Sequence, residues 1–395
     1  MTLFRRGHAL ACLGTLLVCA VVALLLGQRA LGQSPAIPVE NCPSVGIAPQ
    51  VRGFQPGGLI LTSFDRTAIW VYDIDSGRRY PLPETRPCSG NCRLSPDARS
   101  ITYFNEATNA INRMRLNGTE RSLVSAYASD AQWWSADQFL IWTPGHQAYL
   151  LNPASGEREP LASDGIQSVS AGARWGLRTF PMGDFFARAL VDVSYSAEIP
   201  VSERPAIQLG EDRTYFNASS WSPDGSQFAF VSRVMDAGGD LAGSELYMLM
   251  PGRSSIQQVT ELADSYGRAR INGLSAGELS WSPDGTKIAF WVVPMGSDDP
   301  TTDLGLATIH VADLVSGAVT AYCGFSTSEH TPNPPRLRWS PDGTHLAFAG
   351  NVEGDERGYL LVALDLASGR YAELSEGIYP ALGSPEVVAW GLPPG

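Results

Sequence analysis

The chain has 395 residues, of which 44% are hydrophobic, so it is long enough to bury a sizeable core. Its 40 glycines and 28 prolines predict many turns between short strands, and its formal net charge is −12 with a single lysine, Lys287. No basic stripe with interleaved aromatic residues occurs in the sequence, which excludes nucleic acid as an expected partner. The acidic balance indicates a solvated surface that would favour cationic partners.

The first 32 residues are expected to direct the chain out of the cytoplasm. Arg5 and Arg6 precede an apolar run over residues 9–26. One interpretation is a signal peptide cleaved after the small-residue motif Ala30-Leu31-Gly32. The other is an uncleaved membrane anchor through residues 9–26, because the run approaches the roughly 20 residues that span a bilayer. Both place the body outside the cytoplasm, as a periplasmic, secreted or membrane-tethered protein, since positive charge stays inside.

Four cysteines follow this segment, and an even number in an exported chain indicates disulfides. Cys88 and Cys92 could close a short loop on itself. Cys42 would then pair with Cys323 and tie the N-terminal arm, residues 33–56, to the body of the chain. Four cysteines allow three connectivities, and the sequence does not choose among them. A metal or redox role for the C-x3-C pair is the alternative, although no second pair or nearby histidine completes such a site.

One eleven-residue pattern recurs three times, at Ser220–Phe230, Ser280–Phe290 and Arg338–Phe348. Self-similarity at a nearly fixed spacing is typical of repeat architectures. In Ser-Pro-Asp-Gly, Pro presets the backbone of a type I turn and Gly accepts the positive φ after it, so the motif joins two antiparallel strands. We therefore assign structural roles to the following repeat residues: Trp221, Pro223, Asp224, Gly225, Trp281, Pro283, Asp284, Gly285, Trp339, Pro341, Asp342 and Gly343.

A second motif, Asp or Asn three residues before Ser-Gly, follows at a distance. It occurs after the apolar segments that end at Asp73, Asn152, Asp313 and Asp365. An Asx side chain can bond its own backbone and Gly takes the positive φ, so this motif predicts a hairpin connection. The repeating unit is therefore four antiparallel strands, which is the blade of a β-propeller.

We predict an all-β fold with seven four-stranded blades over residues 57–395. Blade one starts late and would take its first strand from the C-terminal segment beginning at Glu386, so that the N- and C-terminal strands pair and close the ring. Blades two and three begin with degenerate turns at Ser95 and Ser135. Blade four, from Val169, has the weakest copy, and six blades are possible if that segment is an insertion.

The repeat resembles the TolB-type, WD40-like (PD40) β-propeller repeat family. The resemblance is strong at residues 221–230, 281–290 and 339–348 and weaker at 92–104 and 134–142. It implies a β-propeller that is often located in the envelope or secreted and often used for protein–protein binding. The repeat residues carry the fold in that family, so the resemblance implies no site.

Two features of the sequence could indicate an enzyme: a G-x-S-x-G match and the histidines. A G-x-S-x-G match surrounds Ser275, but a strand follows it where a nucleophile elbow needs a helix, so we interpret it as a loop between blades. A metal site would need converging histidines among His146, His310, His330 and His345. His345 lies just past a Ser-Pro-Asp-Gly turn and His310 in an expected third strand, so these two fall at different depths of their blades. We therefore predict no catalytic residue, no cofactor and no metal.

Acidic residues in two long loops are the candidate binding residues. The loop of blade five holds Asp236, Asp240 and Glu245, and the corresponding loop of blade six holds the remaining three, Asp298, Asp299 and Asp303. Propellers place binding residues on such loops. The spacing fits no ordered calcium loop.

The sequence thus predicts a monomeric, non-catalytic, extracytoplasmic propeller that binds another protein. An enzyme acting on extracellular glycan or peptide at the channel mouth is the alternative. Aromatic and arginine anchors on one face would favour binding, and a channel-facing trio of His, Asp or Glu would favour catalysis.

Overall fold

The structure is a computed structural model, and it divides the chain into two units, Met1–Ala36 and Ile37–Gly395. It describes the following residues, all of them in the second unit: 44–47, 54–62, 67–86, 88, 92–105, 107–145, 147–161, 165–172, 174–183, 185–195, 198–212, 218–253, 255–272, 279–296, 306–326, 335–351, 357, 359–376 and 387–395. Within these ranges no helix has the length and apolar character needed to cross a membrane. The predicted export segment, residues 1–32, lies outside them.

Four sheets have four strands each. The first has the order β30–β2–β3–β4, with β30 (Val387–Gly391), β2 (Leu59–Thr62), β3 (Trp70–Asp73) and β4 (Arg78–Pro81). The second contains β5 (Arg93–Leu94), β6 (Ser100–Asn105), β7 (Ala110–Arg115) and β8 (Ser122–Ala126). The third contains β9 (Asp130–Trp133), β10 (Phe139–Trp142), β11 (Ala148–Leu151) and β12 (Arg158–Leu161). The fourth contains β13 (Ile166–Val169), β14 (Trp175–Met182), β15 (Phe185–Asp192) and β16 (Ala206–Asp212).

The rest of the chain forms a nine-stranded and a five-stranded sheet. The nine-stranded sheet contains β17 (Ser219–Trp221), β18 (Phe228–Met235), β19 (Leu241–Met250), β20 (Ser255–Gln258), β21 (Ala269–Ile271), β22 (Ser280–Trp281), β23 (Lys287–Pro294), β24 (Leu306–Asp313) and β25 (Val319–Ser326). The five-stranded sheet contains β1 (Ser44–Ile47), β26 (Arg338–Trp339), β27 (His345–Asn351), β28 (Tyr359–Asp365) and β29 (Arg370–Glu376). The described helices are short: η2 (Val201–Glu203), η4 (Pro251–Arg253) and α2 (Leu262–Tyr266).

Each predicted turn motif joins two antiparallel strands, as expected. The Ser-Pro-Asp-Gly turn after Trp281 connects β22 to β23, and six consecutive residues of β23 are buried. Burial on both faces explains why this strand is apolar nearly throughout. The Asx motif at Asp313 connects β24 to β25, where the Asp313 carboxylate accepts the backbone N–H of Val315 at 3.0 Å.

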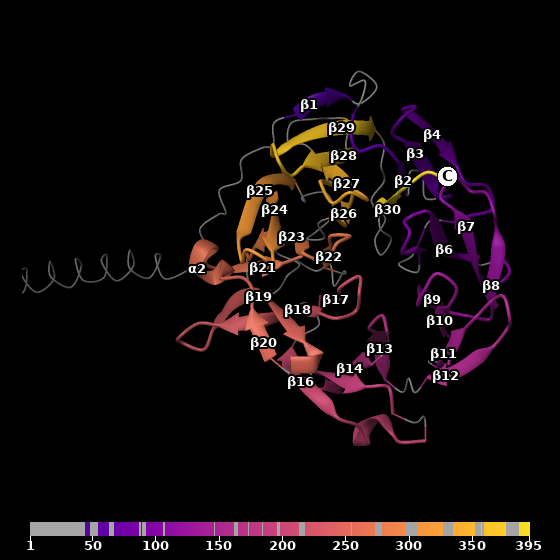
Figure 1. Cartoon of the computed structure of the whole chain (residues 1–395). Helices are drawn as coiled ribbons and strands as arrows, with labels where there is room; N and C mark the ends of the chain where they lie inside the picture. Colours follow the sequence, from indigo (N-terminus) through magenta and orange to yellow (C-terminus); the bar gives the residue numbers. More distant parts are fainter. Residues whose placement is uncertain are drawn as a thin grey trace, which may run out of the picture. The chain divides into compact units, whose positions relative to one another are not determined.

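Apolar clusters fill the spaces between consecutive sheets, which follow one another around a common centre in the second unit (Figure 1). One cluster packs Leu190 of β15 against Phe230 of β18. Another packs Ile60 of β2 against Leu361 of β28, so the first sheet in the chain contacts the last. Full burial of one such side chain contributes about 1.5–3 kcal/mol. The described part of the chain is therefore all-β, and its four-stranded antiparallel sheets fit a β-propeller.

The C-terminal strand completes the sheet of the first strands, as the sequence predicted. β30 pairs antiparallel with β2, with Trp390 opposite Ile60. The Trp390 indole N–H donates to the backbone oxygen of Gly57 at 3.2 Å. This pairing joins residues that are more than 300 positions apart in the sequence.

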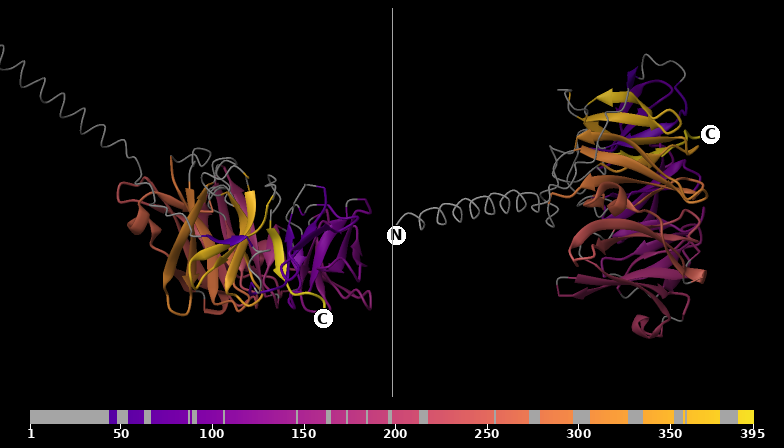
Figure 2. Two further views of the ribbon diagram at one scale, coloured as in Figure 1. Left: turned by 90° about the horizontal axis from the view of Figure 1, so that it is seen from above. Right: turned by 90° about the vertical axis from the view of Figure 1, so that its left-hand side faces the viewer.

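Two elements were not anticipated. Within the N-terminal arm, β1 pairs parallel with β29 and adds a fifth strand to that sheet; Figures 1 and 2 show it as the indigo strand beside yellow β29. The second element is β21, which pairs parallel with β19 and antiparallel with β23 and so merges two four-stranded groups. The close approach needs Gly243, because a Cβ there would lie 2.1 Å from the Ala269 oxygen.

Candidate functional site

The repeat turns form the most regular polar feature of the described structure. Ser282 Oγ donates to Asp284 Oδ1 at 2.5 Å and accepts the Lys287 N–H at 2.9 Å. Gly285 has φ +71° and donates its N–H to the Ser282 oxygen at 2.9 Å. The same Ser-to-Asp bond recurs in three further turns: Ser95–Asp97, Ser222–Asp224 and Ser340–Asp342. The hydrogen bond from Ser282 is the main effect that lowers the pKa of Asp284.

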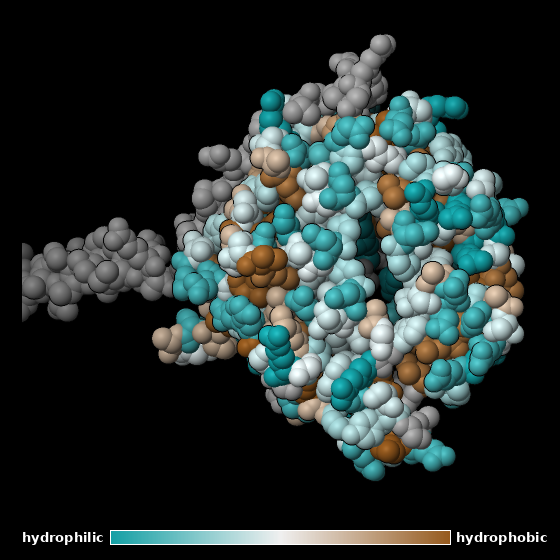
Figure 3. Space-filling view, viewed as in Figure 1, coloured by the Kyte–Doolittle hydropathy of each residue, from teal (hydrophilic) through white to brown (hydrophobic). Residues whose placement is uncertain are grey.

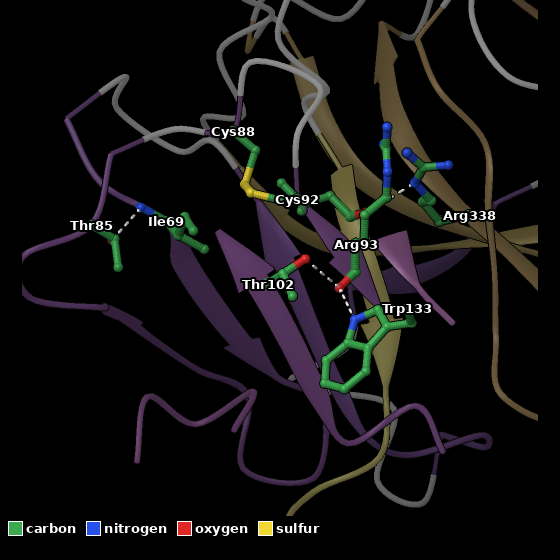
Figure 4. The surroundings of a disulfide bond; sticks show 9 residues. Ile69, Thr85, Cys88, Cys92, Arg93, Thr102, Trp133 and Arg338 are labelled. Carbon is green, nitrogen blue, oxygen red and sulfur yellow. Dashed lines mark hydrogen bonds between the residues drawn. A yellow bond between two sulfur atoms is a disulfide. The ribbon is translucent and has the colours of Figure 1, made fainter. Parts of the chain in front are cut away.

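The repeat tryptophans bond neighbouring groups of strands to one another, which the sequence did not indicate. Trp339 Nε1 donates to the Ser280 oxygen at 2.9 Å, and Trp281 Nε1 donates to the Ser220 oxygen at 3.3 Å. An equivalent hydrogen bond occurs earlier in the chain, where Trp133 Nε1 donates to the backbone oxygen of Arg93 at 2.9 Å (Figure 4). The predicted burial of these tryptophans is complete only for Trp339, which is 6% exposed, while Trp281 is half-buried.

Polar contacts also join the first strands of successive groups. Arg93 of β5 and Asp130 of β9 form an ion pair at 3.2 Å. Arg338 of β26 donates from Nε to the Val388 oxygen of β30 at 2.9 Å. In Figure 1 the first strands β9 and β26 lie toward the common centre of the sheets. Figure 3 shows the same face, with a narrow hollow near its middle that is rimmed by hydrophilic residues. The centre is therefore polar in character.

One predicted disulfide is present. Cys88 and Cys92 are bonded, with their Cα atoms 5.6 Å apart (Figure 4). Cys323 is also disulfide-bonded. Cys42 lies outside the described residues, so its predicted bond to Cys323 stays a prediction. In this structure the C-x3-C pair is therefore a disulfide and not a pair of metal-binding thiolates.

The acidic residues predicted in the blade-five loop fall into two different environments. Asp236 and Asp240 are exposed at the tip of the β18–β19 hairpin. Glu245 belongs to β19 and is only 1% exposed, so it does not lie on this loop. Asp298, Asp299 and Asp303 of the blade-six loop lie outside the described residues.

Glu245 holds the chain that leads into α2. Its carboxylate accepts Thr260 Oγ1 at 2.5 Å, the Leu262 N–H at 2.9 Å and the Ala263 N–H at 2.8 Å. Burial raises the pKa of Glu245, and the hydrogen bond from Leu262 is the largest opposing effect. Three donors in a buried site indicate a structural role.

The two candidate histidines that the structure describes, His310 and His345, have different partners. His310 is 1% exposed; its Nε2 lies 2.8 Å from Tyr266 Oη and its Nδ1 lies 3.2 Å from the Thr308 oxygen. A carbonyl only accepts, so Nδ1 carries the proton and Nε2 accepts from the tyrosine. Burial lowers the pKa of His310 to about 4. His345 instead contacts Thr344 Oγ1 at 2.7 Å.

No group of three or more His, Cys, Asp or Glu side chains that could hold a metal ion occurs among the described residues. His146, His330 and Ser275 lie outside them. Among the described residues, His310 and His345 therefore do not come together in one site. The positions of His146, His330 and Ser275 stay untested.

Sequence reasoning missed a cavity of about 250 Å³ between the first sheet and the last. It is lined by Tyr72 and Arg79 on one side and by residues of β28 and β29 on the other, among them Glu373. No local signal could have found it, because its walls come from segments about 300 residues apart.

No family model and no curated protein matches the chain, whereas many solved structures do. TolB from Acinetobacter baumannii is 19% identical with a TM-score of 0.43, over 89% of this chain and 88% of that one. A putative TolB from Agrobacterium tumefaciens is 17% identical with a TM-score of 0.41, over 73% and 95%. An oligogalacturonate lyase in complex with manganese is 13% identical with a TM-score of 0.47, over 83% and 88%. At these identities and TM-scores the likeness carries no function to this chain.

Proposed function

We propose that this chain is an exported, seven-bladed β-propeller that acts as a non-catalytic scaffold for another protein. The tip of the β18–β19 hairpin, residues 236–240, is part of its docking surface. The observation that carries the proposal is that this tip is exposed and also held in shape by its own hydrogen bonds. Ordered, exposed loops on a rigid sheet are where propellers and other all-β proteins bind.

The seven-blade count is supported by the sheet order. Four sheets have four strands, the five-stranded sheet contains four strands plus β1, and the nine-stranded sheet contains two groups of four plus β21. Closure of the ring is supported by the pairing of β30 with β2 and by the cluster that packs Ile60 against Leu361. A closed ring leaves no exposed edge between its first and last blade.

Export is supported by the sequence and weakly by the disulfides. Arg5 and Arg6 followed by the apolar run of residues 9–26 are typical of a signal peptide or membrane anchor. The disulfide between Cys88 and Cys92 fits an oxidising compartment. Either processing outcome places the hairpin tip outside the cytoplasm.

The tip is internally bonded in four places. The Asp236 N–H donates to the Asp240 oxygen at 2.8 Å, and the Gly239 N–H donates to the Asp236 oxygen at 3.0 Å. Asp236 Oδ1 accepts the N–H groups of Gly238 at 2.8 Å and Asp240 at 2.9 Å. A loop that is already ordered loses less entropy on binding, which favours affinity.

The chemistry of the tip indicates the kind of partner. Asp236 and Asp240 present two carboxylates, and Met235 beside them is 47% exposed. An apolar side chain rimmed by negative charge fits a surface that combines an apolar contact with lysine or arginine. We therefore expect a basic patch on the partner.

The test is site-specific photo-crosslinking in source cells. A photo-reactive residue in place of Ala237 at the tip is compared with one in place of Ala154, which is exposed in the β11–β12 turn. We expect one protein to crosslink reproducibly from position 237 and not from position 154. Equal crosslinking from both positions, or none from 237 while the protein is folded and exported, would count against the docking surface.

A further inference from the structure

A second cleft lies where the turn after β26 faces the sheet that contains β30 and β2. Its volume is about 400 Å³, and its walls come from residues 55–58, Asp75, residues 392–393, Pro341 and Asp342. The strands β26, β27, β30 and β2 lie beside one another in Figure 1. Pockets for small organic ligands measure roughly 300–1,000 Å³, so this cleft is large enough to hold one.

The cleft lies where the packing of one turn on the next is interrupted. A Cβ at Gly285 would lie 3.6 Å from Pro223 Cδ, and one at Gly343 would lie 3.7 Å from Pro283 Cδ, so the proline of one repeat turn lies against the glycine of the next. Pro341 belongs to the last clear turn and lines the cleft. The paired strands beyond it, β30 and β2, come from opposite parts of the sequence, so no turn joins them. The open space beside Pro341 therefore follows from the order of the strands.

Two carboxylates line the cleft without an opposing charge. Asp75 and Asp342 are exposed, and they are the only charged residues among the described residues of its lining. No described side chain forms an ion pair with either of them. Asp342 holds its own turn through Oδ1, which accepts Ser340 Oγ at 2.6 Å and Thr344 Oγ1 at 2.8 Å, so its Oδ2 stays open to a ligand.

The Asp75 carboxylate is also available to a ligand. The backbone of Asp75 is fixed by its N–H, which donates to Asp73 Oδ1 at 3.0 Å, whereas its side chain accepts no hydrogen bond from a described residue. This side chain lies against Gly57, where an added Cβ would be 2.6 Å from Asp75 Oδ1. Glycine at position 57 therefore leaves the room that the carboxylate occupies in the cleft wall.

The rest of the wall is apolar and poor in hydrogen-bond donors. Pro56, Pro341 and Leu392 line it with aliphatic carbon atoms. A proline has no backbone N–H, so the prolines contribute carbonyl acceptors but no donors. A ligand that suits this wall donates hydrogen bonds, carries positive charge and has an aliphatic body. A primary ammonium group has three donors and no acceptor, which matches the carboxylates.

We propose that this cleft binds an aliphatic primary amine in its ammonium form. The ammonium group meets the carboxylates of Asp75 and Asp342, and the methylene chain lies on the prolines and on Leu392. A free diamine and the lysine side chain of a peptide share this chemistry. The cleft uses no residue of the hairpin tip 236–240, so the proposal does not rest on the scaffold function.

The test is calorimetric titration of the full-length purified chain with cadaverine and with Nα-acetyl-lysine amide. Pentanediol, which has the same chain length as cadaverine but no charge, and the dianion glutarate are the controls. We expect saturable binding of at least one amine, weakened by added salt, and no binding of either control. Tighter binding of cadaverine supports a free diamine as the ligand, and tighter binding of the lysine derivative supports a peptide.

Two variants locate the site. Asp75→Asn should weaken amine binding roughly threefold to tenfold, through the loss of one charge-assisted hydrogen bond. Gly57→Ala keeps both charges but displaces the Asp75 carboxylate, so it should weaken binding as well. The matched control is Asp137→Asn, which removes the same charge from an exposed turn that does not line the cleft, and it should bind like the wild type.

Melting temperatures separate binding from folding. Asp75→Asn should melt close to the wild type, because the Asp75 side chain accepts no hydrogen bond from a described residue. Folded wild-type protein that binds neither amine would overturn the proposal. Binding of pentanediol as tight as that of cadaverine, or equal amine affinities of Asp75→Asn and Asp137→Asn, would overturn it too.

Discussion

Trp339 donates from its indole N–H to the backbone oxygen of Ser280, 2.9 Å away in the neighbouring group of strands. Ser280 in turn donates from Oγ to the Leu337 oxygen at 2.8 Å, so the two groups are bonded in both directions. The repeated tryptophan therefore holds one blade-like group to the next, in addition to filling space within its own sheet. This relationship explains why the same residue recurs before each clear turn.

We expect Trp339→Phe to destabilise the protein by about 1–3 kcal/mol. The substitution removes buried ring atoms and leaves the Ser280 oxygen without its donor. Trp281→Phe should cost less, because Trp281 is half-buried and its bond to Ser220 is longer, at 3.3 Å. Urea unfolding followed by circular dichroism measures both. A loss at Trp281 equal to or greater than that at Trp339 would contradict the bridging role.

The turn aspartates should make the protein sensitive to acid. The hydrogen bond from Ser222 is the main effect that lowers the pKa of Asp224, and Ser282 does the same for Asp284. Their folded pKa lies below the ordinary value of 3.8, so their stabilisation is present above that pH. It is lost as the pH falls through the folded pKa.

The measurement is the free energy of unfolding between pH 6 and pH 2.5 for the wild type and Asp284→Ala. We expect the variant to be less stable at pH 6, and the difference to shrink as the pH falls below about 4. A difference that stays constant over this range would show that ionised Asp284 does not contribute.

His310 should produce a second, separate pH dependence. Its folded pKa of about 4 lies below its ordinary value of 6.5, so the unfolded chain binds a proton first as the pH falls. Stability should therefore rise with pH between about 4 and 6.5, by about 3 kcal/mol at most. Subtracting the curve of His310→Gln from that of the wild type isolates the effect. Parallel curves would contradict burial of the neutral imidazole.

Glu245 and Asp236 of the blade-five segment should respond differently to neutralisation. Glu245→Gln should destabilise the protein by about 1–3 kcal/mol, because an amide cannot accept from Thr260, Leu262 and Ala263 as the carboxylate does. Asp236→Asn keeps the Oδ1 acceptor of the exposed tip and should change the melting temperature little. Equal effects of the two variants would contradict the separation that the structure makes.

Gly243 should be the least tolerant glycine of the β18–β19 hairpin. Gly243→Ala places a Cβ 2.1 Å from the Ala269 oxygen, so β21 would have to move away from β19. Gly239 has φ +87° with no atom within 4 Å, so Gly239→Ala should cost only about 1 kcal/mol of backbone strain. Thermal unfolding of both variants checks the difference. Similar losses would contradict a close contact at β21.

Local features of the fold were predictable from the sequence because each depends on a few adjacent residues. The Ser-Pro-Asp-Gly turns and the Asx hairpins follow from such short motifs. The pairing of the C-terminal strand with β2 is long-range, and it was predictable because the segment at Glu386 resembles the first strand of the repeat. In contrast, β21 is three residues long and is defined by its contacts with β19 and β23. No periodicity marks so short a strand.

The candidate site was predictable only in part. The exposed tip at Asp236 and Asp240 follows from an acidic, glycine-rich loop between two strands. The sequence analysis grouped Glu245 with these two residues. In the structure its side chain is buried, and its carboxylate accepts hydrogen bonds from the Thr260–Ala263 segment. The cavity at Tyr72 could not be predicted, because its opposite wall is near Glu373, about 300 residues further along the chain.

The most direct test of the scaffold account is the affinity of the full-length chain for the purified partner that crosslinks from position 237. We predict that Asp236→Asn with Asp240→Asn weakens binding about tenfold or more, and that the effect shrinks at high salt. The matched control, Glu157→Gln with Glu159→Gln on the exposed β12 side, should bind like the wild type. Unchanged affinity of the tip variant, or an equal loss in the control, would contradict docking at this hairpin.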